Sequence, residues 1–159
     1  MKRVLTGLIL FTLIFVVACT NSNTAMKEEP TDKNSLQLLA GDSSKYYRFN
    51  KAHYESSLEE GKVIFLDFHA NWCPICKREQ PKIFAAFNDL NNPNVVGYEV
   101  HFNDGETTKD DKEMAKKYGI TNQYTKVIIN KNGEVVLKTL EVLDKDRITN
   151  EIKKVVGSQ

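Results

Sequence analysis

Residues 63–76 read VIFLDFHANWCPIC, an apolar run that leads into two cysteines three positions apart. The run from Val63 to His69 carries apolar residues on both faces, which is typical of a central strand covered from both sides. Cys73 and Cys76 follow where we expect a helix to begin. The stretch therefore predicts a buried strand that leads into a helix with a cysteine pair at its amino end.

Two cysteines at the start of a helix have different environments. Cys73 faces free backbone N–H groups and the positive end of the helix dipole, and both stabilise a thiolate over a thiol. Cys76 lies one turn into the helix, where we expect it to be more enclosed and placed to resolve a mixed disulfide. The pair therefore predicts a redox-active disulfide with Cys73 as the attacking sulfur.

Two other uses of the cysteine pair are less favoured by the sequence. Structural zinc needs two more ligands at suitable spacing, and the histidines that would supply them are scattered singly, at positions 53, 69 and 101. A purely structural disulfide would close so small a ring that it would stabilise the fold little. We therefore expect no metal site, and no cofactor other than the Cys73–Cys76 disulfide.

The rest of the chain alternates between helix-like and strand-like segments. The dipeptide Asn132-Gly133 is a strong hairpin signal, and Gly61 and Gly119 are typical of helix ends. The pattern predicts helices over residues 49–60, 76–90 (interrupted by Pro81), 110–118 and 145–156, and strands over 63–69, 95–102, 126–130 and 134–140. This order predicts an α/β fold with a central mixed β-sheet flanked by helices on both faces.

Composition limits the classes of protein to which the chain can belong. It has 159 residues, of which 41% are hydrophobic and 27% are charged, and this indicates one ordinary globular domain. With 22 basic and 21 acidic side chains the formal charge is +1, so the chain has no overall attraction for nucleic acid or acidic lipid. We expect no nucleic-acid partner.

The amino-terminal residues have the pattern of a signal peptide. Two basic residues precede an uncharged apolar run from Val4 to Ala18, which is shorter than the ~18–20 residues needed to span a bilayer. The run ends in Val16-Val17-Ala18-Cys19, which resembles the bacterial lipobox and implies acylation of Cys19 and cleavage before it. The alternative is an ordinary cleavable signal, which would leave Cys19 as an unpaired thiol.

We expect three segments: a lipoprotein-type signal peptide over residues 1–18, a flexible tether over 19–44 and a folded domain over 45–157. Residues 20–35 are mostly polar and cannot bury enough apolar surface to fold. The apolar cluster in Leu36–Ala40 predicts at most a short turn at the domain edge. Without its signal peptide the chain is close to neutral, so anchoring must come from acyl chains rather than from a basic patch.

Residues 66–81 resemble the active-site segment of the thioredoxin-like fold, in particular that of its membrane-tethered, extracytoplasmic members. Besides the cysteines, the matching features are an aspartate six residues before Cys73, a tryptophan directly before it and Pro81 eight residues after it. The pair of Glu79 and Pro81 is similar to the TlpA/ResA branch of thiol–disulfide oxidoreductases. The short chain between the cysteines and the last hairpin is closer to thioredoxin itself or to the C-terminal domain of DsbD.

A cis-proline that family members carry opposite the cysteines is missing here. The corresponding loop contains no proline, and either Tyr124 or Thr125 takes its place. Since a cis bond without proline costs ~3–4 kcal/mol, we expect a trans loop. The resemblance implies that this loop and the residues around the cysteines touch the substrate, so the predicted contact residues are Trp72, Pro74, Ile75, Tyr124 and Thr125.

Two carboxylates near the cysteines are candidates for acid–base chemistry. Asp67 lies in an otherwise apolar strand, where burial without a cation raises a carboxyl pKa, and we expect it to shuttle the proton of Cys76. The alternative is a hydrogen-bonded buried acid with no role. Glu79 shares the helical face of Cys76, where its charge opposes thiolate formation, or else it lies on a solvated face. His69 shares the strand face of Asp67 and either tunes the thiolate, touches substrate or is a satisfied core histidine.

The resemblance implies an enzyme, a thiol–disulfide oxidoreductase of the protein disulfide reductase type. We expect a monomer in the bacterial cell envelope, lipid-anchored on the extracytoplasmic side, which acts on protein thiols and disulfides and is recycled by a membrane redox partner. The alternative is a binding module, in which the same cysteines hold a soft metal or an iron–sulfur cluster because the shielding proline is absent.

Overall fold

The apolar run of the sequence forms β3 (Val63–His69), which lies in the middle of the sheet. In the computed structural model, which describes residues 36–158, every residue of β3 is buried, as the sequence predicts for a strand covered on both faces. β3 pairs in parallel with β4 (Val95–His101) and antiparallel with β5 (Thr125–Ile129). The strand that leads to the cysteines is therefore held on both sides.

The described strands form a six-stranded sheet in the order β1-β2-β4-β3-β5-β6. At one edge β1 (Leu38–Ala40) runs antiparallel to β2 (Lys45–Arg48), which is parallel to β4. At the other edge β6 (Val135–Thr139) forms a hairpin with β5, and Gly133 in its turn has a φ of +80°, as an Asn-Gly turn requires. The sheet is therefore mixed, as predicted.

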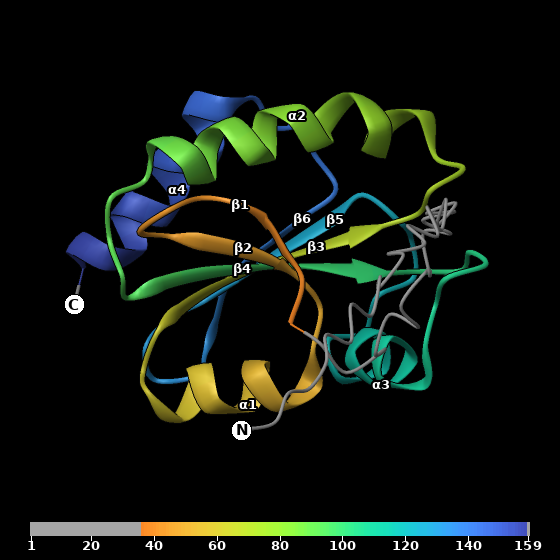
Figure 1. Cartoon of the computed structure of the whole chain (residues 1–159), viewed down its shortest axis with the longest axis horizontal. Coiled ribbons are helices and arrows are strands. Elements are labelled where there is room, and N and C mark those ends of the chain that lie inside the picture. The colour runs from red at the N-terminus through yellow and green to blue at the C-terminus, as the bar shows by residue number, and fades with distance from the viewer. Residues whose placement is uncertain (1–35, 159) are drawn as a thin grey trace, which may run out of the picture. The chain divides into compact units, whose positions relative to one another are not determined.

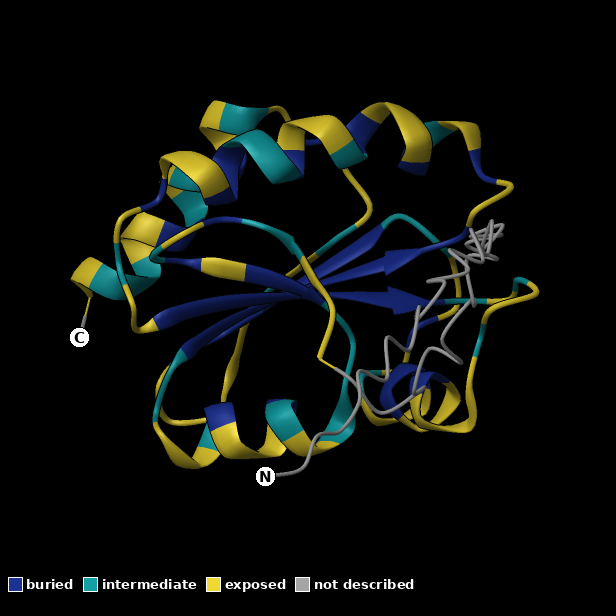
Figure 2. Ribbon diagram, in the orientation of Figure 1, coloured by how far each residue is buried: buried dark blue, intermediate teal, exposed yellow. Residues whose placement is uncertain are grey.

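Helices cover both faces of this sheet (Figure 1). On one face lie α2 (Pro74–Asp89) and α4 (Lys145–Gly157), and on the other lie α1 (Lys51–Glu59) and α3 (Lys109–Lys117). Figure 2 shows that the central strands are buried along their length, whereas the helices are buried only on the side that faces the sheet. This arrangement confirms the predicted fold class.

Alternate residues of each strand contribute to two separate hydrophobic cores, because successive side chains point to opposite faces of a sheet. The core between the sheet and the pair α2 and α4 contains Phe65, Phe87 and Ile128. The core on the α1 and α3 face contains Leu66 and Tyr98, among other residues. Asp67 follows the parity of Phe65, so its side chain belongs to the α2 face.

Within residues 49–157 the predicted helices and strands are all present, with bounds that differ by at most two residues. Two details were wrong. The predicted tether over residues 19–44 includes β1, whose backbone pairs with β2 and whose Leu39 and Ala40 pack against the α2 and α4 core. Helix α2 begins at Pro74 and continues through Pro81, because buried residues on both sides of Pro81 hold it against the sheet.

The signal peptide, Cys19 and most of the predicted tether lie outside the described residues. Among the helices of residues 36–158, none is both long enough and apolar enough to cross a bilayer.

Gly97 of β4 leaves space for two aromatic rings of the α2 and α4 core. A Cβ at this position would lie 2.4 Å from Tyr46 Cδ2 and 2.4 Å from Phe87 Cζ. Because both rings are fully buried and have no room to move, we expect Gly97→Ala to lower the free energy of unfolding by about 1–3 kcal/mol in urea titrations. Gly105→Ala is the matched control, since nothing lies within 4 Å of the added Cβ. Equal unfolding midpoints for the two variants would contradict this packing.

Candidate active site

The two cysteines lie where β3 ends and α2 begins, in the arrangement that the sequence predicts. Cys73 is the N-cap of α2, and its Sγ accepts a hydrogen bond from the backbone N–H of Cys76 at 3.3 Å. Pro74 follows in the first turn, where its missing N–H costs nothing. A thiolate on Cys73 would therefore receive a backbone N–H and the positive end of the helix dipole.

The sequence analysis predicts that Cys76 is more enclosed than Cys73, but the two residues are equally buried. Cys73 and Cys76 are thiols, and each residue is only 2% exposed. Burial, a hydrogen bond to Cys73 and the charge of Asp67 raise the pKa of Cys76 to about 12, against the lowering effect of a backbone hydrogen bond with Ala70. Cys76 is therefore a weak nucleophile until a neighbouring group removes its proton.

Four charged side chains lie in one row across the sheet. Strand register aligns Arg48 of β2 with Glu99 of β4, Glu99 with Asp67 of β3, and Asp67 with Lys126 of β5. Arg48 Nη1 donates to Glu99 Oε1 at 2.9 Å, and α2 contributes Gln80, whose Nε2 donates to Glu99 Oε2 at 2.7 Å. We call Arg48, Glu99, Asp67 and Lys126 the charged row. It lies on the face of the sheet that α2 covers.

Asp67 lies in the middle of the charged row and holds its proton at neutral pH. Burial raises the pKa of Asp67 to about 8; Lys126 acts to lower it, and the charges of Glu99 and Glu79 act to raise it. The predicted raised pKa is confirmed. The assumption that no cation lies nearby is wrong, because strand pairing places Lys126 beside Asp67. A carboxyl with this pKa can accept a proton and return it near neutral pH.

Glu79 of α2 and Lys126 form a buried ion pair that sequence reasoning missed. Lys126 is fully buried and Glu79 is 1% exposed, so the interpretation of Glu79 as a solvated side chain is wrong. Glu79 Oε1 also accepts the backbone N–H of Leu143 at 2.7 Å, and Lys126 Nζ donates to the carbonyl oxygen of Glu141 at 3.2 Å. The pair therefore joins β5, α2 and the loop before α4, while the predicted effect of Glu79 on the thiols stays a prediction.

The signal for this pair was a lysine inside an apolar strand. Lys126 shares a strand face with Ile128, which packs in the core beneath α2. A charged residue at an inward position of a strand needs a partner of opposite charge. That partner lies 47 positions away in the sequence, so its identity was not apparent from the local pattern.

Tyr124 occupies the place opposite the cysteines where the resemblance expects a cis-proline. It packs against the cluster of Ala70, Cys73 and Cys76, and Lys126 Nζ lies 5.8 Å from the centre of its ring. No peptide bond within residues 36–158 is cis, which confirms the predicted trans loop.

The backbone at Tyr124 is strained, with a φ of +53° that bulky residues rarely adopt. The backbone N–H of Tyr124 donates to the carbonyl oxygen of Phe68 at 2.6 Å. Proline can neither adopt this φ nor donate this hydrogen bond. The loop is therefore built for a residue other than proline.

The predicted substrate-contact residues differ in exposure. Trp72 is 54% exposed, Pro74 is exposed, and Ile75 and Tyr124 are half-buried, so a partner can reach all four. The side chain of Thr125 is not on the surface, so contact of this residue with substrate through its backbone stays a prediction. Thr125 is 3% exposed and its hydroxyl donates to the carbonyl oxygen of Asn122 at 2.7 Å, because its strand position directs the side chain to the α1 and α3 face.

The loop that carries Trp72 is fixed to the loop that follows β4. Trp72 Nε1 donates to the carbonyl oxygen of Asn103, and the backbone N–H of Asn71 donates to Asp104 Oδ2, each at 3.0 Å. Burial alone would raise the pKa of Asp104, but hydrogen bonds from Asn71 and His101 hold it at about 2. The indole ring beside Cys73 is therefore held in place by an ionised carboxylate and a carbonyl group.

His69 ends β3 and lies next to His101 of β4. It is 4% exposed, and its contact with substrate stays a prediction. Its Nδ1 lies 3.9 Å from Glu99 Oε2 and has no hydrogen-bond partner within residues 36–158, so His69 is not a satisfied core histidine. Burial lowers the pKa of His69, and an effect on the thiolate stays a prediction.

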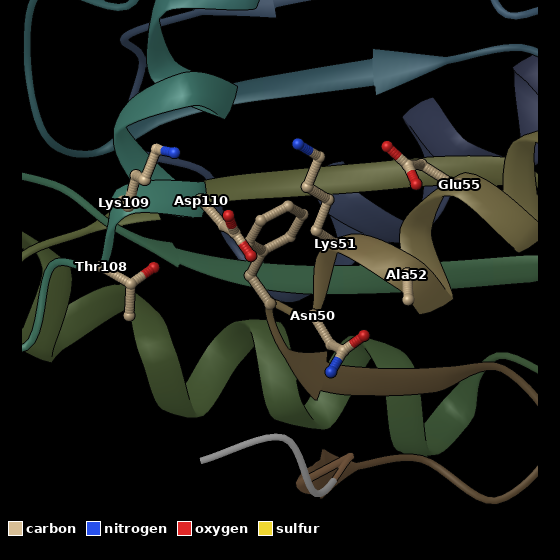
Figure 3. A pocket seen from close by; sticks show the side chains of 8 residues that line it. Asn50, Lys51, Ala52, Glu55, Thr108, Lys109 and Asp110 are labelled. Carbon is tan, nitrogen blue, oxygen red and sulfur yellow. The ribbon is translucent and has the colours of Figure 1, made fainter.

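An open groove of about 450 Å³ is lined by residues other than those of the thiol site. Figure 3 shows its lining from α1 and the amino end of α3, where lysines and carboxylates alternate: Phe49, Asn50, Lys51, Ala52, Glu55, Thr108, Lys109 and Asp110. The groove contains no cysteine or histidine. Across the described part of the chain, no three His, Cys, Asp or Glu side chains are grouped so that they would hold a metal ion.

Comparisons with known proteins agree with this geometry. The sequence profile of the thioredoxin family matches residues 45–154. The chain is 30% identical over 93 residues to the thiol-disulfide oxidoreductase ResA of Halalkalibacterium halodurans, which covers 48% of this chain and 53% of that protein. It is 25% identical over 116 residues to a thioredoxin of Chlorobaculum thiosulfatiphilum, which covers 72% of this chain and 100% of that protein. The chain thus spans about half the length of ResA and the whole of the thioredoxin.

Solved structures show the same fold. The crystal structure of Schistosoma mansoni thioredoxin has a TM-score of 0.54 at 28% identity and covers 72% of this chain and 98% of that one. Thioredoxin from Aeropyrum pernix has a TM-score of 0.56 at 19% identity and covers 77% of this chain and 95% of that one. These relatives support thiol–disulfide oxidoreductase activity and do not favour the metal-binding alternative.

The titration of Asp67 should make folding stability depend on pH. The unfolded aspartate ionises near 3.8, whereas the folded group keeps its proton up to about pH 8. Between these values the folded state binds one proton more than the unfolded state, so this contribution to stability is lost as pH rises, by at most about 1.4 kcal/mol per pH unit. The free energy of unfolding of Asp67→Asn, measured in urea, should therefore rise relative to that of the reduced wild type between pH 5 and pH 8.

Taking the difference between the two proteins at each pH cancels the titration of other groups, such as His69. A difference that stays constant over this range would mean that Asp67 titrates alike in the folded and unfolded states.

Proposed function

Because the chain belongs to the thioredoxin family, we propose that it is a protein disulfide reductase that works outside the cytoplasm on a lipid anchor. The observation that carries the chemistry is the arrangement at the start of α2. Cys73 caps the helix and accepts the N–H of Cys76, while Cys76 has a raised pKa and needs a proton acceptor, for which buried Asp67 is suited. This is a set of groups for thiol–disulfide exchange in two steps.

In the first step the Cys73 thiolate attacks one sulfur of a substrate disulfide. A bond forms between Cys73 Sγ and that sulfur, the substrate S–S bond breaks, and the other substrate sulfur leaves as a thiolate that takes up a proton. In the second step the ionised Asp67 accepts the proton of Cys76, and Cys76 Sγ attacks Cys73 Sγ. The second substrate sulfur leaves as a thiolate. The substrate has then gained two electrons, and Cys73 and Cys76 form a disulfide.

The direction of electron flow is supported by the surroundings of Cys76. A strongly oxidising cysteine pair is one whose reduced form is stabilised, as happens when the dithiol is held as a thiolate. Here burial, the Cys73 hydrogen bond and the charge of Asp67 all oppose a Cys76 thiolate. Cys76 therefore adds no stabilisation of this kind to the reduced form, which favours a pair that gives electrons to its substrates.

The anchor is proposed from the sequence before the domain. The lipobox-like Val16-Val17-Ala18-Cys19 would place acyl chains on Cys19. A flexible tether of about 20 residues, as the sequence predicts between this anchor and the domain, would have a root-mean-square reach of ~25 Å. That reach suits protein partners near the membrane. We therefore propose protein thiols and disulfides as substrates, a membrane redox partner for recycling, and a monomer in the bacterial cell envelope as the working form.

The alternative of a metal or iron–sulfur module assumed that a missing proline leaves the sulfurs open. Tyr124 packs against the cysteine cluster in its place, and each cysteine is 2% exposed. This covering removes the reason for the alternative.

Mixed disulfides with partner proteins should separate the roles of the two cysteines. We expect Cys76→Ser to accumulate them, because Cys73 still attacks but nothing resolves the product. Cys73→Ser should accumulate few, because the remaining thiol is still buried, and burial is the largest cause of the raised pKa of Cys76. Non-reducing gels of cells that express each variant measure the difference. Equal trapping by the two variants would contradict the assigned roles.

Membrane attachment should depend on Cys19. We expect Cys19→Ala to move the protein from the membrane fraction to the soluble fraction while the purified protein still reduces insulin. Cys73→Ser is the control and should stay with the membrane, because the change lies in the folded domain. Recovery of Cys19→Ala in the membrane fraction would show that something other than an acyl group holds the protein there.

A further inference from the structure

Lys126 is fully buried, which is rare for a lysine, and it takes no part in the two steps of disulfide exchange. Its ammonium pairs with Glu79 and donates to the carbonyl oxygen of Glu141 at 3.2 Å. On the neighbouring strand its direct partner is Asp67. The ammonium therefore pairs with an acidic residue on α2, and the register neighbour of the lysine on β3 is a second acidic residue.

We propose that Lys126 is a positioning residue for the thiol chemistry, whose charge keeps Asp67 able to ionise and so to accept the proton of Cys76, and that Glu79 limits this effect by pairing with the same ammonium. The inference rests on the proposed function, because proton transfer to Asp67 is a step of the disulfide exchange. Lys126 acts through Asp67 and not on the sulfurs.

The formal charges around Asp67 give the direction of each effect. Arg48 and Lys126 carry +2, and their ion-pair partners Glu99 and Glu79 carry −2, so the group is neutral when Asp67 is protonated and carries −1 when it is ionised. Without Lys126 the ionised state would carry −2, and without Glu79 it would be neutral. Excess charge is costly in a buried site. Removing Lys126 and removing Glu79 should therefore change the ionisation of Asp67 in opposite directions.

Several elements around Asp67 carry titratable groups, and Lys126 is the one whose charge acts directly to favour ionisation of Asp67. Glu99 on β4 and Glu79 on α2 oppose it, and Lys126 on β5 promotes it. Cys76 on α2 stays a thiol near neutral pH. Tyr46 on β2 stays protonated, because burial and the charges of Asp67 and Glu99 raise its pKa. No group among these can replace the ammonium.

The acid–base step gives the proposal a measurable consequence. Asp67 accepts the proton of Cys76 only when it is ionised, so the rate at which Cys76 resolves a mixed disulfide should rise with pH as Asp67 ionises. A change at Lys126 that makes Asp67 harder to ionise moves this rise to higher pH. A change that only disturbed the packing of the site would lower the rate of resolution. It would not shift the pH dependence of that rate in the direction that the charges predict.

The test titrates the Asp67 carboxyl directly, by carbon-13 NMR of the reduced protein labelled at aspartate, with Asp67→Asn to identify the signal. We expect Lys126→Met to move the titration to higher pH by about one to three units and Glu79→Gln to move it to lower pH. The double variant should return close to the wild type. The rise with pH in the rate of resolution of a Cys73–glutathione mixed disulfide should move with each titration. Lys131→Met, at an exposed lysine in the β5–β6 turn, is the matched control and should change neither.

Shifts of opposite sign in the two single variants would support the proposal. An unchanged titration in Lys126→Met, or shifts of the same sign, would overturn it. Should Lys126→Met fail to fold, the double variant must titrate at least one unit above Glu79→Gln, or the proposal fails. A wild type that reduces neither insulin nor a glutathione mixed disulfide would overturn the proposed function and leave the titration result standing.

Discussion

The buried ion pair of Glu79 and Lys126 connects the parts of the molecule that meet at the cysteines. It joins α2 to β5, and its hydrogen bonds to the backbone of Leu143 and Glu141 fix the loop that leads into α4. Removing one partner of such a pair leaves an uncompensated buried charge, at a cost of about 3–5 kcal/mol. This ion pair therefore determines both the position of α2, which carries Cys76, and the charge beside Asp67.

The chemistry needs a difference between two sulfurs that exposure to solvent does not supply. Cys73 caps α2, where the helix stabilises its thiolate, whereas the pKa of Cys76 is raised to about 12. The pKa of Asp67 is raised only to about 8, so transfer of the Cys76 proton to Asp67 is unfavourable at rest. Cys76 therefore transfers its proton to Asp67 only in the step in which its sulfur attacks Cys73. Cys76 stays unreactive until Cys73 has formed a mixed disulfide with the substrate.

Tyr124 determines what a partner meets on the other side of the cysteines. Its φ of +53° is kept by a hydrogen bond to Phe68 and by packing against the cysteine cluster. Strained backbone of this kind is retained where the surrounding structure holds it in place. The surface around Cys73 therefore presents aromatic side chains, Trp72 and Tyr124, where the resemblance leads one to expect a proline loop.

Local sequence patterns by themselves determined the strand over residues 63–69, the cysteine pair at a helix start and the hairpin at Asn132-Gly133, because periodicity, capping and turn chemistry involve near neighbours. They also determined that Asp67 is buried with a raised pKa. Only the tertiary structure decided which charges surround it. Glu79 and Lys126 are 47 positions apart in the sequence. Lys126 lies beside Asp67 because of the register between β3 and β5, and the position of Thr125 in β5 likewise determines that its side chain is buried. A pattern shows which face of a strand is buried, but what covers that face depends on how the whole sheet and its helices pack.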